Sequence, residues 1–343
     1  MTAIEVAIVG GGNFGTAIAN IAARNGYRTH LWMRDERQVA DCLELRENRR
    51  YLPGHRLHDL VCPTDDLETA LDRSSVIFMT VPSASFRQVS ELLAEHSDAD
   101  DIVISATKGI ERKSDGSGFR LMSEILDELV PTRHIGVLSG PNLAEEIADG
   151  HYTGTVVASR DPAVCDTVRT VLKSETFRVY QNPDVYGVEL AGALKNIYAI
   201  VCGIAGGLSV GQNTVAMLIT RSLAEMSRFA VSLGANPFTF LGLAGVGDLL
   251  VTCTSPLSRN YQLGFRLAQG LSLSEALEDL GKLAEGVNTL RVVHERAQEL
   301  GVYMPLAAGL HRVLFDHEDM GEVVTELMTG GQGVDVAFAR PGA

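Results

Sequence analysis

The 343-residue sequence has few of the features that mark several classes of protein. Its five cysteines are odd in number and scattered without CxxC spacing, which indicates reduced thiols in a cytosol instead of a disulfide framework. Its nine histidines form no HxxxH or Cys/His cluster, so we expect no metal site. The formal net charge of −14 argues against a nucleic-acid partner, which would need a basic stripe. We therefore expect a cytoplasmic protein without metal.

The sequence pattern also argues against a leader and against a membrane span. The chain enters a predicted strand almost at once, with no charged-then-apolar leader, so we expect no signal peptide. One long apolar stretch, 188–208, is apolar on every side of a helical wheel, which is typical of a buried helix. Glu189, Lys195 and Asn196 would sit poorly in lipid, so we expect no membrane span. Lys195 is then either a structural ion-pair partner or a catalytic lysine facing a cleft.

A glycine-rich turn follows the first predicted strand, 4–9. Gly10, Gly12 and Gly15 satisfy G-x-G-x-x-G, and an apolar helix begins within the motif. One glycine makes the tight turn, one lets a pyrophosphate approach the backbone, and one allows helix and strand to pack closely. The helix N-terminus then offers N–H groups to the phosphates. At the first strand–helix turn this spacing predicts a dinucleotide site.

The next strand, 29–33, ends at Arg34 and Asp35. An acidic residue there commonly binds the ribose hydroxyls of NAD, whereas an arginine accommodates the 2′-phosphate of NADP. Because Arg34 comes first, the sequence favours NADPH over NADH. A surface arginine that starts a helix is the alternative interpretation.

The remaining apolar runs predict two domains. Runs at 76–81, 102–106, 135–138, 155–158 and 177–180 are typical of buried strands. Strand patterns almost vanish after Asn182-Pro183, which we expect to supply an N-cap and a proline in the first helical turn. The sequence therefore predicts a dinucleotide-binding domain, 1–183, and an all-helical substrate domain, 184–343.

Several polar groups are placed where a substrate could be held. Lys108 follows the strand 102–106, and ligands of doubly wound sheets bind at the carboxyl ends of strands, although a solvated loop lysine is the alternative. In the helical half, Lys195-Asn196, Asp248 and the 258–260 segment stand in apolar surroundings. A serine, arginine and asparagine early in a helix can jointly hold a phosphate. Together with a dinucleotide fold, these groups favour an anionic pocket.

The sequence resembles the bacterial NAD(P)-dependent glycerol-3-phosphate dehydrogenases over nearly its whole length. The segments that carry the resemblance are GGGNFGTAIA, YLPG, VPS, TKGI, SGPNLAEEIA, GVELAGALKNIYAI, ITRSLAEM, GLAGVGDLLVTCTSPLSRN and AEGVNT. The combination is specific, because GALKN and TSPLSRN have no general structural reason to occur together. The resemblance implies an α/β fold with an N-terminal Rossmann-like doubly wound sheet. An all-helical C-terminal domain similar to that of 6-phosphogluconate dehydrogenase would follow it.

The resemblance also implies roles for individual residues. Lys195 would be the proton donor and acceptor. The substrate contacts would be Lys108, Gly140, Asn142, Lys195, Asp248, Ser258, Arg259 and Asn260. The cofactor contacts, which include the glycines of the turn, would be Gly10, Gly12, Asn13, Phe14, Gly15, Arg34, Lys108, Ala144, Arg259, Leu283 and Glu285. The sequence departs from the usual family pattern in having Asn142 for Ser or Thr, Asn13-Phe14 for Ser-Trp, and Leu283 for Val.

The implied reaction interconverts dihydroxyacetone phosphate and sn-glycerol 3-phosphate with NADPH or NADH and feeds phospholipid synthesis. Lys195 would protonate the developing alkoxide; in reverse it would accept the hydroxyl proton, which requires a lowered pKa. Lys108 would add positive charge near the reacting oxygen and disfavour a second ammonium beside it. Arg259 would hold the phosphate.

Two other functions are considered. A 6-phosphogluconate- or 3-hydroxyacid-type dehydrogenase could use the same scaffold, and it would favour a carboxylated substrate. A catalytically silent NAD(P)-binding sensor would have no need of Lys195, Lys108 and Arg259 together. The sequence leaves the oligomeric state open, and a homodimer is compatible with it.

Overall fold

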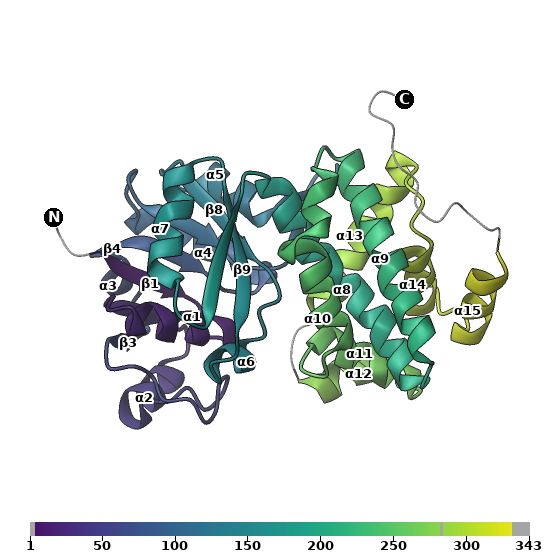
Figure 1. Cartoon of the computed structure of the whole chain (residues 1–343), viewed down its shortest axis with the longest axis horizontal. Coiled ribbons are helices and arrows are strands. Elements are labelled where there is room, and N and C mark those ends of the chain that lie inside the picture. The colour runs from purple at the N-terminus through teal and green to yellow at the C-terminus, as the bar shows by residue number, and fades with distance from the viewer. Residues whose placement is uncertain (1–3, 282–283, 331–343) are drawn as a thin grey trace. The chain divides into compact units, whose positions relative to one another are not determined.

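The computed structural model describes residues 4–281 and 284–330, which form two compact units (Figure 1). The first unit holds the chain up to Ala193 together with Ala235–Thr252. The second holds Leu194–Gly234 and the chain from Cys253 onward. The division at residue 183 stays a prediction, and the return of Ala235–Thr252 to the first unit is a feature that the sequence pattern does not reveal.

The first unit is built on one eight-stranded sheet, in the order β10-β9-β8-β5-β4-β1-β2-β3. The six neighbouring strands β8-β5-β4-β1-β2-β3 are parallel to one another. Strand β9 runs antiparallel to β8, and β10 is parallel to β9. Val9 pairs with Trp32 on one side and with Met79 on the other, so three central strands end level. The strands are β1 (Glu5–Val9), β2 (Thr29–Trp32), β3 (Val61–Thr64), β4 (Ser74–Met79), β5 (Ile102–Ser105), β8 (His134–Ser139), β9 (Thr153–Ser159) and β10 (Phe177–Asn182).

Helices cover both faces of this sheet. Alternation along β1 sends Val6 and Ile8 into a core with α1 and α7, while Ala7 and Val9 enter a second core with α4 and α5. Two buried faces explain the near-continuous apolar strands and confirm the expected doubly wound α/β fold. The helices are α1 (Asn13–Arg24), α2 (Glu36–Leu45), α3 (Leu67–Leu71), α4 (Ser83–His96), α5 (Met122–Leu129), α6 (Ala144–Ala148) and α7 (Pro162–Leu172).

Three local predictions need correction. The amphipathic pattern of residues 117–130 predicts one helix, but β7 (Phe119–Leu121) occupies its start, paired in a hairpin with β6 (Ile110–Arg112), and α5 begins only at Met122. The charged, helix-like pattern of residues 35–50 predicts a helix over the whole stretch, but α2 ends before Arg46, whose positive φ of 51° stops it. Asp184, not Asn182, accepts the N–H of Gly187 in the first turn of α8 (Val185–Gly207), while Asn182 accepts the N–H of Asp184.

Beyond Asn182 the described residues form helices and no strand, as the sequence predicts. Helix α8 is long and apolar enough to cross a membrane, but 94% of its most apolar stretch is buried inside the protein, as in a core helix. The other elements are α9 (Gln212–Ser232), η1 (Pro237–Leu241), η2 (Leu243–Gly247), α10 (Asp248–Thr254), α11 (Arg259–Ala268), α12 (Leu273–Leu280), α13 (Glu285–Leu300), α14 (Pro305–Phe315) and α15 (Met320–Thr329).

A buried carboxyl group joins three helices of the second unit. Glu225 on α9 accepts the backbone N–H groups of Leu306 and Ala307 at 2.8 and 3.2 Å, at the start of α14. It also accepts the hydroxyl of Tyr198 on α8 at 3.1 Å. Burial raises the pKa of Glu225 from 4.5 to about 7, although these three hydrogen bonds oppose that rise.

The raised pKa makes the contribution of Glu225 to stability depend on pH. The folded protein retains a proton that the unfolded chain releases, so stability is lost as the pH rises from 4.5 to about 7. We expect the difference in unfolding free energy between wild type and Glu225→Gln to fall across this window. The slope should be at most roughly 1.4 kcal/mol per pH unit. Urea unfolding of both proteins across the window measures it, with the exposed Glu278→Gln as control. A pH-independent difference would contradict the assignment.

Candidate functional site

The turn between β1 and α1 is shaped by its glycines. Gly10 has a φ of +124°, and a Cβ on Gly15 would lie 2.0 Å from the carbonyl oxygen of Gly10, so both positions require glycine. A Cβ on Gly12, the N-cap of α1, would meet nothing within 4 Å. The turn is therefore tight on its inner side and open at Gly12. This shape and the helix N-terminus suit the pyrophosphate of a dinucleotide.

Other cofactor residues expected from the sequence surround this turn. Asn13 and Phe14 are the first two residues of α1, and the half-buried Phe14 and Ala144 pack against the same core. Arg34 is exposed at the end of β2. Asp35 caps α2 by accepting the N–H of Arg37 at 3.0 Å, and it also binds Arg50 at 2.7 Å. The carboxylate that would otherwise bind ribose is thus engaged by the protein.

A charged pair lies where Lys108 was expected, beyond the carboxyl end of β5. The ammonium of Lys108 donates to Asp248 Oδ2 at 2.8 Å and to the carbonyl of Gly140 at 3.1 Å. Asp248 is fully buried, and the hydroxyl of Thr252 donates to its backbone carbonyl at 2.6 Å. Asp248 therefore fixes the ammonium and offsets its charge. This pairing across 140 residues of sequence was not expected.

The turn after β8 provides further polar groups. Gly140 has a φ of +142°, and a Cβ there would lie 3.2 Å from the Cα of Thr155. Asn142 accepts the hydroxyl of Thr155 at 2.8 Å and donates to the carbonyl of Gly154 at 3.3 Å. The buried hydroxyl of Ser139 has no hydrogen-bond partner among the described residues. An orphaned hydroxyl beside Gly140 and Lys108 is consistent with a ligand site.

In the second unit, hydrogen bonds connect three of the motifs. Asn260 donates to the side-chain oxygen of Asn196 at 3.0 Å and accepts the N–H of Gly286 at 3.0 Å. These bonds join the segments that carry Lys195, Arg259 and Glu285. Lys195 is 6% exposed on α8, whereas Arg259 is exposed in the first turn of α11.

The start of α11 is capped by Ser258, whose hydroxyl accepts the N–H of Tyr261 at 3.3 Å. Glu285 is the first residue of α13. Leu283, also expected to contact the cofactor, lies outside the described residues. Sequence reasoning missed the supporting residues Gln38, Asn48, Thr80, Ser139 and Thr155, because isolated polar side chains in helices, strands and loops carry no periodic signal.

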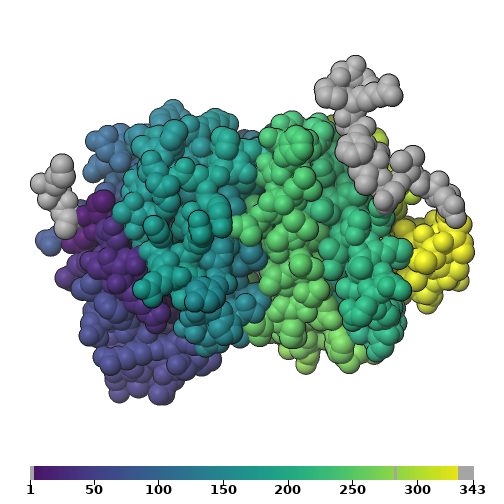
Figure 2. Space-filling model, viewed as in Figure 1, coloured from purple at the N-terminus to yellow at the C-terminus, as the bar shows by residue number. Residues whose placement is uncertain are grey.

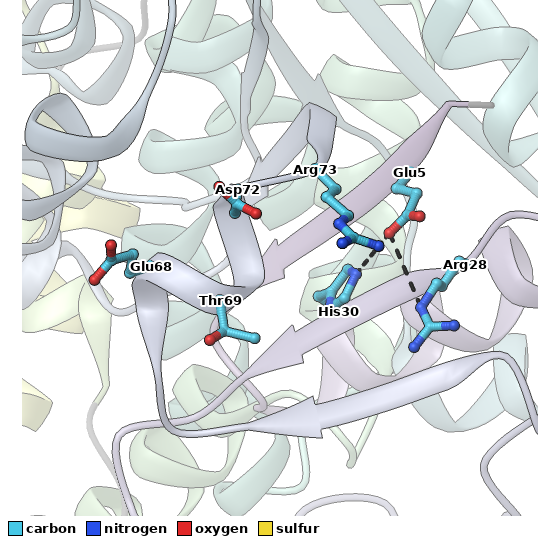
Figure 3. Close-up of a pocket in the computed structure, with 7 residues that line it drawn as sticks. All are labelled: Glu5, Arg28, His30, Glu68, Thr69, Asp72 and Arg73. Carbon is cyan, nitrogen blue, oxygen red and sulfur yellow. Dashed lines mark hydrogen bonds and ion pairs between the residues drawn. The ribbon is translucent and has the colours of Figure 1, made fainter. Parts of the chain in front are cut away.

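A surface depression in the first unit lies elsewhere. It measures about 420 Å³ and is lined by Glu5, Arg28, His30, Glu68, Thr69, Asp72 and Arg73 (Figure 3). Its Glu5 binds His30 at 2.9 Å and Arg28 at 3.9 Å. The lining lies at the amino ends of β1, β2 and β4, away from the glycine turn, and it mixes acids with bases. It is therefore a poor match for an anionic substrate.

Comparisons with known proteins identify the family. The model for the NAD-dependent glycerol-3-phosphate dehydrogenase N-terminus matches residues 5–165, and the model for its C-terminus matches residues 184–325. The chain belongs to the NAD-dependent glycerol-3-phosphate dehydrogenase family. The expected family, enzyme class and NAD(P) dependence are thereby confirmed.

Individual relatives agree with this assignment. The chain is 56% identical to glycerol-3-phosphate dehydrogenase (NAD(P)+) of Saccharophagus degradans, over 96% of this chain and 91% of that one. It is 54% identical to the protein of the same name from Azotobacter vinelandii, over 97% and 96%. Among solved structures, glycerol-3-phosphate dehydrogenase of Coxiella burnetii matches with a TM-score of 0.90 and 36% identity, covering 96% of this chain and 100% of that one.

Proposed function

We propose that this glycerol-3-phosphate dehydrogenase reduces dihydroxyacetone phosphate to sn-glycerol 3-phosphate and thereby supplies glycerophospholipid synthesis. The observation that carries the proposal is the Lys108–Asp248 pair, 2.8 Å apart at the carboxyl edge of a sheet whose first turn fits a dinucleotide. A cation fixed by a buried carboxylate at this edge can donate a hydrogen bond to a polar substrate without reorganising.

The residues divide the chemistry among them. A bound nicotinamide supplies the hydride that is added to the carbonyl carbon. Lys195 donates a proton to the oxygen that becomes the alcohol, and in the oxidation direction its neutral amine accepts that proton. Lys108, with its charge offset by Asp248, acts as a positioned donor more than as an uncompensated cation.

The remaining groups bind the phosphate and orient the substrate. Arg259 is placed in the first turn of α11, where the helix N-terminus favours an anion, and Ser258 caps that turn. Asn260 holds this turn through Asn196 and Gly286. The turn of Gly140 and Asn142 completes the set of proposed substrate contacts.

The direct test is a steady-state assay of NADPH and NADH oxidation with dihydroxyacetone phosphate. We expect saturable, cofactor-dependent turnover. Unphosphorylated dihydroxyacetone should be a poor substrate, because it offers no phosphate to Arg259. Preference for 6-phosphogluconate or a 3-hydroxyacid, or cofactor binding without turnover of any of these compounds, would overturn the proposal.

NADPH preference forms part of the proposal. The carboxylate of Asp35 is engaged by the N-terminus of α2 and by Arg50. Arg34, which precedes it at the end of β2, is exposed. We therefore expect Arg34→Ala to weaken NADPH binding by a charged hydrogen bond, roughly 1.5–3 kcal/mol, and to leave NADH binding nearly unchanged. Fluorescence titration of both cofactors measures this, with Arg24→Ala as a control on the exposed surface. An equal loss for both cofactors would refute the role of Arg34.

A cytoplasmic location and a homodimer are also proposals. All five cysteines are free thiols, and four of them are buried, which suits a reducing compartment. Sedimentation of the purified protein across a concentration series tests the homodimer.

A further inference from the structure

Two buried amide side chains hold the carbonyl group at the centre of the glycine turn. Gln38 Nε2 donates to the oxygen of Gly11 at 2.7 Å, and Asn48 Nδ2 donates to the same oxygen at 3.0 Å. The two amides also contact each other at 3.3 Å. Gln38 is 8% exposed and Asn48 is 1% exposed. Burying an amide side chain costs free energy unless it forms hydrogen bonds. The bonds to the Gly11 carbonyl offset that cost for both Gln38 and Asn48.

The same network reaches the start of α1. Asn48 Nδ2 also donates to the hydroxyl of Thr16 at 2.8 Å, and that hydroxyl donates to the carbonyl of Gly12 at 2.8 Å. On the other side of the turn, the hydroxyl of Thr80 donates to the carbonyl of Gly10 at 2.7 Å. Three consecutive carbonyl groups of the turn are thus held by side chains from within the first unit.

Holding the Gly11 carbonyl also orients the next N–H group. The described peptide bonds are all trans, so the N–H of Gly12 points away from the carbonyl oxygen of Gly11. That carbonyl faces the buried amides, and therefore the N–H faces the opposite side. Gly12 is also the position at which an added Cβ would meet open space. The amides consequently direct a backbone donor toward the open side of the turn, where a phosphate would be received.

The YLPG segment, residues 51–54, secures Asn48. The carbonyl of Asn48 accepts the N–H groups of Tyr51 and Leu52 at 3.2 and 2.8 Å, and Leu52 is fully buried in the core. The N–H of Gly54 in turn donates to Glu47 at 2.8 Å. Figure 2 shows α2 and the following loop (indigo) as a continuous outer part of the first unit. The core-anchored segment fixes the backbone from which Asn48 reaches the turn.

We propose that Asn48, supported by Gln38, is a positioning residue that orients the pyrophosphate-binding turn for both NADH and NADPH. It acts through the Gly11 carbonyl, and we assign it no contact with the cofactor. The proposal rests on the NAD(P) dependence of the family, and binding of both cofactors by the wild type checks that premise separately.

The test compares Asn48→Ala with Asn20→Ala. Asn20 is a matched control, because it is 4% exposed and bonds the backbone of Arg56 and His58 instead of the glycine turn. Cofactor dissociation constants are measured by quenching of the fluorescence of Trp32, the single tryptophan, and stability by urea unfolding. Asn48→Ala should weaken NADH and NADPH binding by the same factor, roughly tenfold, the equivalent of one hydrogen bond. Asn20→Ala should lower the free energy of unfolding, while its dissociation constants for both cofactors should stay within about twofold of the wild-type values.

A second variant covers the case in which Asn48→Ala does not fold. Gln38→Met retains the length of the side chain and removes one donor to Gly11, and it should weaken both cofactors in parallel. The KM for dihydroxyacetone phosphate at saturating cofactor should stay within about twofold of wild type for either variant. Stability loss with unchanged cofactor binding, or a loss confined to one of the two cofactors, would overturn the proposal.

Discussion

Replacing Lys195 by methionine is expected to leave a folded protein that binds cofactor and has almost no turnover. Lys195 is 6% exposed on the mainly apolar helix α8, and methionine matches the volume of its apolar stem. Loss of the proton donor should lower kcat by roughly 10²–10⁴-fold, the usual contribution of a general acid. The cofactor dissociation constant should change little.

Stopped-flow measurement of NADPH oxidation, together with thermal unfolding, tests this expectation. The control is Lys173→Met, which removes an exposed lysine at the end of α7 and should leave turnover unchanged. Near-normal turnover of Lys195→Met would return Lys195 to the role of a structural ion-pair partner. Failure of the variant to bind cofactor would instead mean that Lys195 maintains the structure of the cofactor site.

Removing Arg259 should have the second-largest effect, and the effect should depend on the substrate. Arg259 lies in the first turn of α11 in a chain whose net charge of −14 would otherwise repel a phosphate. Arg259→Ala should lower kcat/KM for dihydroxyacetone phosphate by about 10- to 100-fold or more, taking a charged hydrogen bond at roughly 1.5–3 kcal/mol. Unphosphorylated dihydroxyacetone should lose much less.

Two controls separate phosphate binding from other roles of Arg259. Any loss of cofactor affinity is measured first and subtracted, since Arg259 is also an expected cofactor contact. Arg266→Ala, on the same helix, removes a guanidinium that binds Asp279 at 2.5 Å and should affect both substrates little. An equal remaining loss for both substrates would mean that Arg259 stabilises the fold. The phosphate site would then be sought at Lys108 and the turn of residues 140–142.

The apolar strands and the glycine turn could be predicted because their signals are local. A strand buried on both faces, such as β4, is a continuous apolar run, and the G-x-G-x-x-G spacing follows from backbone geometry. Strand β3 was missed because Pro63 and Thr64 in a strand of four residues resemble a loop. The antiparallel direction of β9 and β10 was equally hidden, because an apolar run carries no direction.

The candidate site was predictable residue by residue but not in its internal contacts. The family motifs mark Lys108 and Asp248, yet no local pattern shows that these two side chains form an ion pair. Asn260 was expected to contact substrate, and the structure shows that its amide bonds Asn196 and Gly286. Contacts between side chains that are far apart in the sequence depend on tertiary packing. The periodic patterns of a single sequence do not show which side chains will meet.

The first unit can be completed only late in translation. Its last segment, Ala235–Thr252, follows 41 residues that belong to the second unit, Leu194–Gly234. Until that segment leaves the ribosome, Lys108 lacks Asp248, and Asp184 lacks the N–H of Asn236 and the hydroxyl of Thr239. A nascent chain that ends near residue 193 therefore lacks these three contacts, and its first unit is completed only by continued synthesis. For the same reason, cutting the gene at that point would give an N-terminal fragment that lacks part of the first unit and a C-terminal fragment that carries this part inside the second unit.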